Sequence, residues 1–70
     1  MVNGYKIREL RLEKGLTCTD VSNLSRNLNF PISKTYLEEL ERGAKRNPSF
    51  NIIETISIIL KVNLDELRVS

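Results

Sequence analysis

Apolar residues recur at intervals of three and four along most of the chain, and glycine, proline and polar residues interrupt this pattern at short distances. The spacing is typical of amphipathic helices, and no stretch alternates for long enough to predict a strand. A first helix is expected over about residues 3–14, because Gly15 can end it in the left-handed conformation. A second helix should begin at Thr17, which can form a capping box with Asp20, and should reach residue 27 or 28.

The second helix should bury one face, made of Val21, Leu24 and Leu28. A turn follows, because Pro31 disfavours helical geometry in the residue before it. The third helix is expected over residues 33–42, with Ser33 as its cap and Gly43 as its stop. Its buried residues should be Leu37 and Leu40.

A fourth helix should open at Asn47 or Ser49, and its wide apolar stripe should form the centre of the core. The stripe consists of Ile52, Ile53, Ile56, Ile59 and Leu60. Asn63 can cap a last short helix that packs back on the others. These elements predict an all-α fold, a five-helix orthogonal bundle that forms a single domain over residues 1–70.

Composition limits the classes of function. Hydrophobic residues make up 40% and charged residues 29% of the chain, which indicates a globular protein. The single cysteine, Cys18, excludes an internal disulfide, and without histidine no metal site is expected. No cofactor is expected, and no acid–base or nucleophile–base spacing suggests an enzyme. The chain lacks a signal-peptide pattern at its N-terminus and an apolar run of membrane-spanning length, so no membrane partner and a cytoplasmic location are expected.

The net charge of +2 is unevenly distributed. Residues 1–16 carry four cations and two acidic residues, and residues 43–50 carry two cations and no acidic residue, so each segment sums to +2. Residues 17–32 sum to 0, and residues 33–42 and 51–70 each sum to −1. Positive charge therefore gathers on the first helix and in one loop, where the phosphates of a nucleic acid could bind. A solvated helix face and a polar loop explain the charge equally well.

Four segments, taken in their order and spacing, resemble those of a known family. They are residues 7–17 (Ile-Arg-Glu-Leu-Arg-Leu-Glu-Lys-Gly-Leu-Thr), 36–43 (Tyr-Leu-Glu-Glu-Leu-Glu-Arg-Gly), 47–50 (Asn-Pro-Ser-Phe) and 60–67 (Leu-Lys-Val-Asn-Leu-Asp-Glu-Leu). Together they resemble Xre-type phage-repressor helix-turn-helix proteins. The resemblance implies a lambda-repressor-like DNA-binding domain with double-stranded DNA as its partner. It further implies a sequence-specific transcriptional regulator of bacterial or phage type, with repression as the expected effect.

The resemblance also implies roles for individual residues. In this family the first turn of the third helix enters the major groove, which points to Lys34, Thr35 and Glu39 as base contacts. Arg11 and Glu41 match a family ion pair between the first helix and the end of the third. The implied phosphate contacts are Thr17, Cys18, Thr19, Tyr36, Arg42, Lys45 and Arg46.

Some of these assignments have an alternative reading. Cys18 occupies the place of the family's usual glutamine and is a poor donor. Its phosphate contact would therefore pass to Thr17, Thr19 or the helix N-terminus. Tyr36 could be a packing residue, and each exposed residue could be a solvated surface residue without a partner.

The connection between the second and third helices departs from the family pattern. It is several residues longer than usual, Ser22 replaces the usual alanine, and residues 25–32 replace the short glycine-containing turn. We expect Phe30 and Ile32 to be buried on either side of Pro31 and to set the tilt of the third helix.

Two questions stay open at the level of sequence. A DNA-binding regulator is the leading hypothesis, and the alternative is a protein-interaction module, such as an antitoxin or an anti-repressor. The net charge of −1 over residues 33–42 supports that alternative. Members of the family bind DNA as dimers, and here a homodimer would form through residues 62–69, with Leu64, Leu67 and Val69 as candidates. The same residues could instead close a small core.

Overall fold

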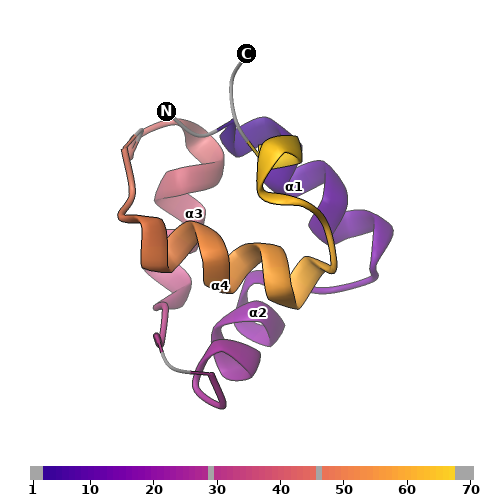
Figure 1. Ribbon diagram of the computed structural model, residues 1–70, viewed down its shortest axis with the longest axis vertical. Coiled ribbons are helices and arrows are strands. Elements are labelled where there is room, and N and C mark those ends of the chain that lie inside the picture. The colour runs from indigo at the N-terminus through magenta and orange to yellow at the C-terminus, as the bar shows by residue number, and fades with distance from the viewer. Residues whose placement is uncertain (1–2, 29, 46, 68–70) are drawn as a thin grey trace.

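A computed structural model of the protein describes residues 3–28, 30–45 and 47–67. All secondary-structure elements in these residues are helices (Figure 1). The elements are α1 (Gly4–Glu13), α2 (Cys18–Ser25), α3 (Lys34–Arg42), α4 (Phe50–Leu60) and the 3₁₀ helix η1 (Leu64–Leu67). No strand occurs in the described residues, which confirms the all-α prediction. The prediction of five α-helices is wrong, because the last element is a single 3₁₀ turn.

Contacts at both ends hold η1 in place. The Asn63 N–H donates a hydrogen bond to the Glu66 carboxylate at 3.1 Å, which fixes the start of the turn. At the other end the Leu67 side chain is completely buried, and the Leu67 carbonyl accepts the Asn3 N–H at 2.7 Å. Leu67 thus anchors η1 in the core and to the residue before α1.

Polar N-caps set the starts of the four α-helices. Each cap has an extended backbone, and its side chain accepts the N–H three residues further on. At its other end α3 stops at Gly43, whose φ of 84° lies in the left-handed region that glycine adopts easily. The caps are Asn3, Thr17, Ser33 and Ser49.

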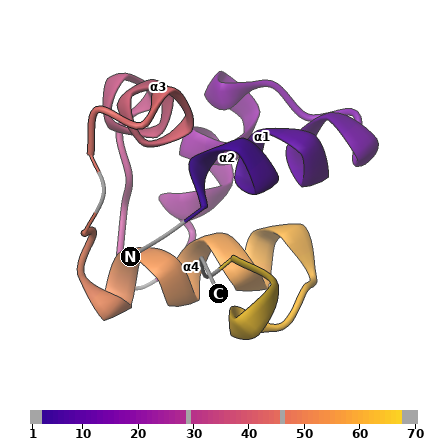
Figure 2. The same cartoon turned by 90° about the horizontal axis from the view of Figure 1, so that it is seen from above.

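The helices cross one another in two layers. Figure 2 shows α1 and α3 on one side and α4 with η1 on the other. α3 packs against both α1 and α2, while α4 packs against α2 and η1. Gly4 allows α1 to approach α3 closely, because a Cβ at this position would collide with the carbonyl oxygen of Leu40.

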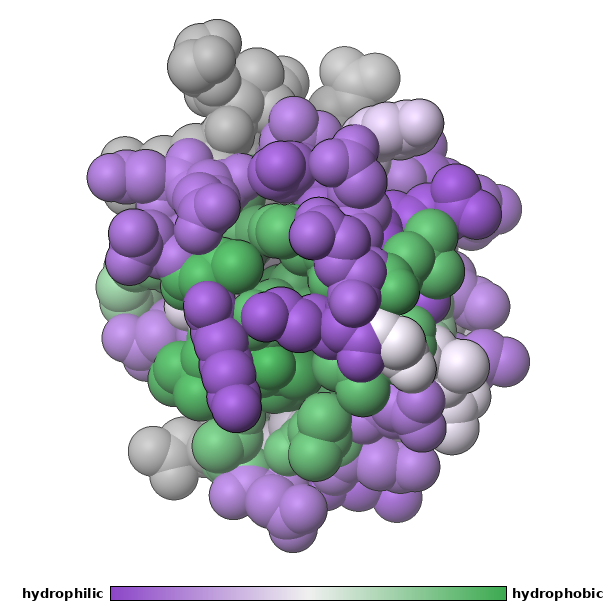
Figure 3. All heavy atoms as spheres, turned by 90° about the vertical axis from the view of Figure 1, so that its right-hand side faces the viewer, coloured by the Kyte–Doolittle hydropathy of each residue, from purple (hydrophilic) through white to green (hydrophobic). Residues whose placement is uncertain are grey.

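The core draws apolar side chains from every helix and from the connection before α3. Ile56 and Leu60 of α4 are buried at its centre, while Ile52, Ile53 and Ile59 of the predicted stripe are only partly buried. So small a core cannot cover all apolar residues. Figure 3 shows apolar side chains at the surface of the face that carries α1, η1 and the end of α4. The remaining buried apolar residues are Ile7, Leu10, Val21, Ile32, Leu37, Leu40 and Leu67.

α2 turns serines toward the interior where leucines were expected. Of the predicted apolar face only the first residue is buried, since Leu24 is 43% exposed and Leu28 is half-buried. Ser22 and Ser25 are buried instead. α2 also ends earlier than predicted, because residues 26–28 continue in tighter turns whose N–H groups bond to carbonyls three residues back.

The reason for this orientation lies in the connection between α2 and α3. Ser25 Oγ accepts the Ile32 N–H at 2.8 Å, and Ser22 Oγ donates to the Ile32 carbonyl at 2.8 Å. The Ile32 side chain is buried as predicted, whereas Phe30 is only half-buried, so that part of the prediction is wrong. Because the connection is fastened through the backbone of Ile32, it does not need Phe30 as a second buried anchor.

Arg11 joins three parts of the fold. Its Nε and Nη2 donate to the two carboxylate oxygens of Glu41, each at 2.8 Å, and its Nη1 donates to the carbonyl of Leu16 at 2.8 Å. The side chains of Arg11 and Glu41 are only 11% and 6% exposed. The hydrogen bonds to Glu41 raise the pKa of Arg11, so the guanidinium stays charged. This bidentate pair links α1, the α1–α2 turn and the end of α3.

Replacing Arg11 by methionine should strongly destabilise the protein. Arg11→Met leaves the Glu41 carboxylate buried without its partner, and we expect the free energy of unfolding in urea to fall by about 3–5 kcal/mol. Adding Glu41→Leu should recover much of that loss, because the uncompensated charge is then removed as well.

The matched control is Lys6→Met. Lys6 pairs with Glu9 at 3.7 Å, and the two side chains are 37% and 53% exposed. Removing this exposed pair should cost less than about 1 kcal/mol. An Arg11→Met variant as stable as Lys6→Met would contradict the role given to the buried pair.

Candidate nucleic-acid interface

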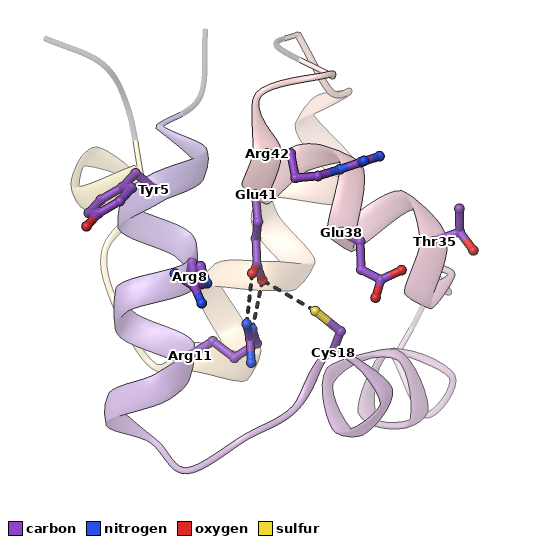
Figure 4. A pocket seen from close by; sticks show the side chains of 8 residues that line it. All are labelled: Tyr5, Arg8, Arg11, Cys18, Thr35, Glu38, Glu41 and Arg42. Atoms are coloured by element: carbon purple, nitrogen blue, oxygen red, sulfur yellow. Dashed lines mark hydrogen bonds and ion pairs between the residues drawn. The ribbon is translucent and has the colours of Figure 1, made fainter.

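The candidate base contacts lie on the exposed side of α3. Lys34 and Thr35 occupy its first turn and are exposed. Glu39 is half-buried, and the neighbouring Glu38 is exposed. Residues three and four apart share one face of a helix, so Thr35, Glu38 and Arg42 form one stripe. Figure 4 shows these three side chains on α3, with Glu38 pointing toward the start of α2.

A groove of about 640 Å³ runs between α3, α1 and the start of α2 (Figure 4). The exposed cations Arg8 and Arg42 border it, from α1 and α3 respectively. The buried pair of Arg11 and Glu41 forms its floor, where opposite charges neutralise each other. The complete lining is Tyr5, Arg8, Arg11, Cys18, Thr35, Glu38, Glu41 and Arg42.

The sequence prediction missed three residues of this groove, Tyr5, Arg8 and Glu38. Glu38 follows Thr35 by three positions, and this spacing could have identified it as a neighbour on the same face. Arg8 precedes Arg11 by three positions on α1, so the two residues likewise share one face of their helix. Helical spacing from a residue already assigned was therefore the available signal.

Cys18 points into the groove and not outward from the start of α2. Its thiol donates to Glu41 Oε2, with a sulfur–oxygen distance of 3.6 Å (Figure 4). Burial raises the pKa of the Cys18 thiol, and the charge of Glu41 raises it further against the opposing effect of Arg11. The thiol is therefore protonated at neutral pH and serves as an additional donor to Glu41. Thr17 and Thr19, on either side, are both exposed.

The other candidate phosphate contacts differ in exposure. Tyr36 is half-buried and packs against the core, while Arg42 and Lys45 are exposed at the end of α3 and just beyond it. Lys45 reaches this position through the left-handed turn at Gly43. Arg46 lies outside the described residues.

The candidate dimer residues are divided between core and surface. Leu67 is completely buried within the protein, so it closes the core. Val62 and Leu64 are half-buried, and Val69 lies outside the described residues. Among the described residues of this segment, Val62 and Leu64 are therefore the apolar side chains left for a homodimer contact.

Two further classes of site were searched in the described part of the chain. No group of three or more histidine, cysteine, aspartate or glutamate side chains is placed to hold a metal ion there. None of the described helices combines the length and the apolar character that a membrane span requires.

Comparison with known proteins identifies close relatives. The HTH-type transcriptional regulator SinR of Bacillus subtilis (strain 168) is 30% identical over 64 residues, which cover 91% of this chain and 53% of SinR. SlrR of the same organism is 34% identical over 64 residues, which cover 91% of this chain and 32% of SlrR. The chain thus spans about half the length of SinR and a third of that of SlrR.

The fold has a similar counterpart among solved structures. The crystal structure of SinR, described as the master regulator for biofilm formation, in complex with DNA superposes with a TM-score of 0.78 at 29% sequence identity. The match covers 89% of this chain and 90% of that one. Residues 7–67 also match the helix-turn-helix family model, which is most of the 70 residues. The chain therefore belongs to the Xre-type helix-turn-helix family.

Proposed function

We propose that this chain is the DNA-binding part of a sequence-specific transcriptional regulator, most simply a cytoplasmic repressor, that reads the major groove with α3. The observation that carries the proposal is the similarity of nearly the whole fold to SinR in its complex with DNA. The relatives SinR and SlrR are themselves named as transcriptional regulators, which favours this function over a protein-interaction module.

Under this proposal α3 and the start of α2 have different tasks. The exposed first turn of α3 enters the major groove, where Lys34 donates to guanine O6 and N7 and Thr35 meets a thymine methyl group or an acceptor. A carboxylate on the same helix accepts from cytosine N4. Glu39 was the sequence-based candidate, and the exposed Glu38 beside Thr35 is the better placed of the two.

Phosphate contacts hold α3 in register on the duplex. Thr17 and Thr19 at the start of α2 bind one phosphate together with the helix N-terminus. Arg42 and Lys45 bind the backbone beyond the other end of α3. Arg8, on the far border of the groove, adds a cation from α1.

The acidic character of α3 is compatible with this proposal. The segment carries three carboxylates, but Glu41 is buried and bonded to both Arg11 and Cys18. Only Glu38 and Glu39 therefore act on an approaching phosphate. Lys34 and Arg42 balance these two charges on the same helix, so the net repulsion is much smaller than the sequence total suggests.

The function is tested by DNA binding at a series of salt concentrations, with Arg42→Ala as the informative variant. A duplex selected by the protein from a random pool and a scrambled duplex of the same composition are compared by fluorescence anisotropy. Affinity for both should fall steeply with salt, and Arg42→Ala should weaken both alike and reduce the slope by about one unit.

Lys61→Asn is the charge-matched control for that variant. Lys61 is exposed at the far end of α4 with a φ of 57°, a conformation that asparagine tolerates, so its replacement should leave the slope unchanged. A protein that binds no duplex at low salt would overturn the proposed function.

Lys34→Ala should instead reduce sequence discrimination. If Lys34 reads a base, affinity for the selected duplex should fall by roughly 1–3 kcal/mol and affinity for the scrambled duplex by clearly less. The same anisotropy titrations measure both losses. An equal loss on the two duplexes would reduce Lys34 to a phosphate contact.

A further inference from the structure

Two buried hydroxyl groups of α2 lie outside the groove, and their hydrogen bonds go to Ser22 and Ile32, which are not candidate DNA-binding residues. Ser25 is completely buried and Ser22 is 6% exposed. Both belong to the stretch where the chain departs from the family pattern. Their hydroxyl groups form hydrogen bonds with the backbone of one residue in the following connection, Ile32.

The hydrogen bonds around Ile32 satisfy both of its backbone groups. Ser25 Oγ accepts the Ile32 N–H at 2.8 Å and donates to the Ser22 carbonyl at 2.6 Å, with the Ile32 carbonyl a more distant acceptor at 3.3 Å. Ser22 Oγ donates to the Ile32 carbonyl at 2.8 Å. Within the described residues the Ile32 backbone has no other hydrogen-bond partner. We call this arrangement of Ser22, Ser25 and Ile32 the serine clasp.

The serine clasp acts next to the start of the recognition helix. Ser33, the N-cap of α3, directly follows Ile32, and Lys34 and Thr35 come next. The Ile32 side chain is itself buried in the core at 4% exposure, so the peptide is held on both sides. These contacts to the backbone and side chain of Ile32 therefore fix the position of the first turn of α3 relative to α2, despite the long connection before it.

The other described residues of the connection offer fewer constraints. Pro31 is exposed, and Phe30 is only half-buried. The tight turns over residues 26–28 bond only to carbonyls of α2 and so do not reach α3. A buried N–H that loses its acceptor is costly, so without the clasp the Ile32 peptide would have to move toward water.

We propose that Ser22 and Ser25 are positioning residues for DNA recognition, which hold the Ile32 peptide and thereby aim the first turn of α3 into the major groove. This inference rests on the proposed function, because α3 must be the reading helix. In the usual family pattern a short turn fixes the second helix relative to the third. In this chain the two buried serines of α2 take over that role.

The test compares Ser25→Ala with Ser57→Ala. Ser57 is a matched control, because it is also a buried serine, with 6% of its surface exposed. Its hydroxyl donates to the Glu54 carbonyl at 2.7 Å, which is a bond within α4 alone. Affinities for the selected and the scrambled duplex are measured at a temperature where circular dichroism shows every variant fully folded. Amide hydrogen exchange at Ile32 is followed by NMR in the same samples.

Ser25→Ala should speed exchange at Ile32 and lower the ratio of selected to scrambled affinity by about tenfold, the value of one well-made base contact. Ser57→Ala should leave that ratio unchanged. A purely structural role would lower both affinities together or neither, so the ratio separates positioning from stability. Ser22→Ala, which removes one hydrogen bond and restores the family's usual residue, should lower the ratio less and serves if Ser25→Ala does not fold.

An unchanged affinity ratio in a folded Ser25→Ala or Ser22→Ala variant would overturn the inference while leaving the proposed function intact. Failure of the unsubstituted protein to distinguish the two duplexes would instead overturn the proposed reading of sequence by α3, and the positioning role with it.

Discussion

The buried ion pair of Arg11 and Glu41 is the interaction on which the rest of the structure depends. Its hydrogen bonds tie α1 to the end of α3 and to the carbonyl of Leu16, just before the cap of α2. In a chain of 70 residues the apolar core is small, so a fixed polar link between three segments has a large share in defining their arrangement. The same pair neutralises Glu41 at the floor of the groove, which under the proposed function reduces the repulsion between α3 and the phosphates of DNA.

Different side-chain contacts hold the two ends of α3. The ion pair fixes its C-terminal end against α1, and the serine clasp fixes the peptide before its N-terminal end against α2. A helix fastened at both ends has little freedom to tilt, which suits the proposed role of placing side chains within hydrogen-bonding distance of base edges. Lys34 and Thr35, the proposed base contacts, take part in neither of these two contacts. They are exposed, and we expect that they can be replaced without altering the fold.

Local signals in the sequence predicted the helices better than the surfaces they present. The capping box of Thr17 depends on neighbours three residues apart, and the sequence predicted it correctly. The exposure of Leu24 depends on Ser25 bonding a segment beyond the helix, a contact that periodicity does not contain. Whether Glu38 or Glu39 borders the groove depends on which side of α3 the first helix packs, and only the assembled fold decides it.

The central claim is that DNA lies against the starts of α2 and α3 and the loop after α3. An NMR titration of the backbone amides with a duplex at low salt tests it most directly. We predict that the largest changes in amide chemical shift occur at residues 17–19, 34–35 and 43–45, and that the amides of α4 and η1 are nearly unaffected. Changes concentrated in α4 and η1, with the starts of α2 and α3 unmoved, would contradict the account.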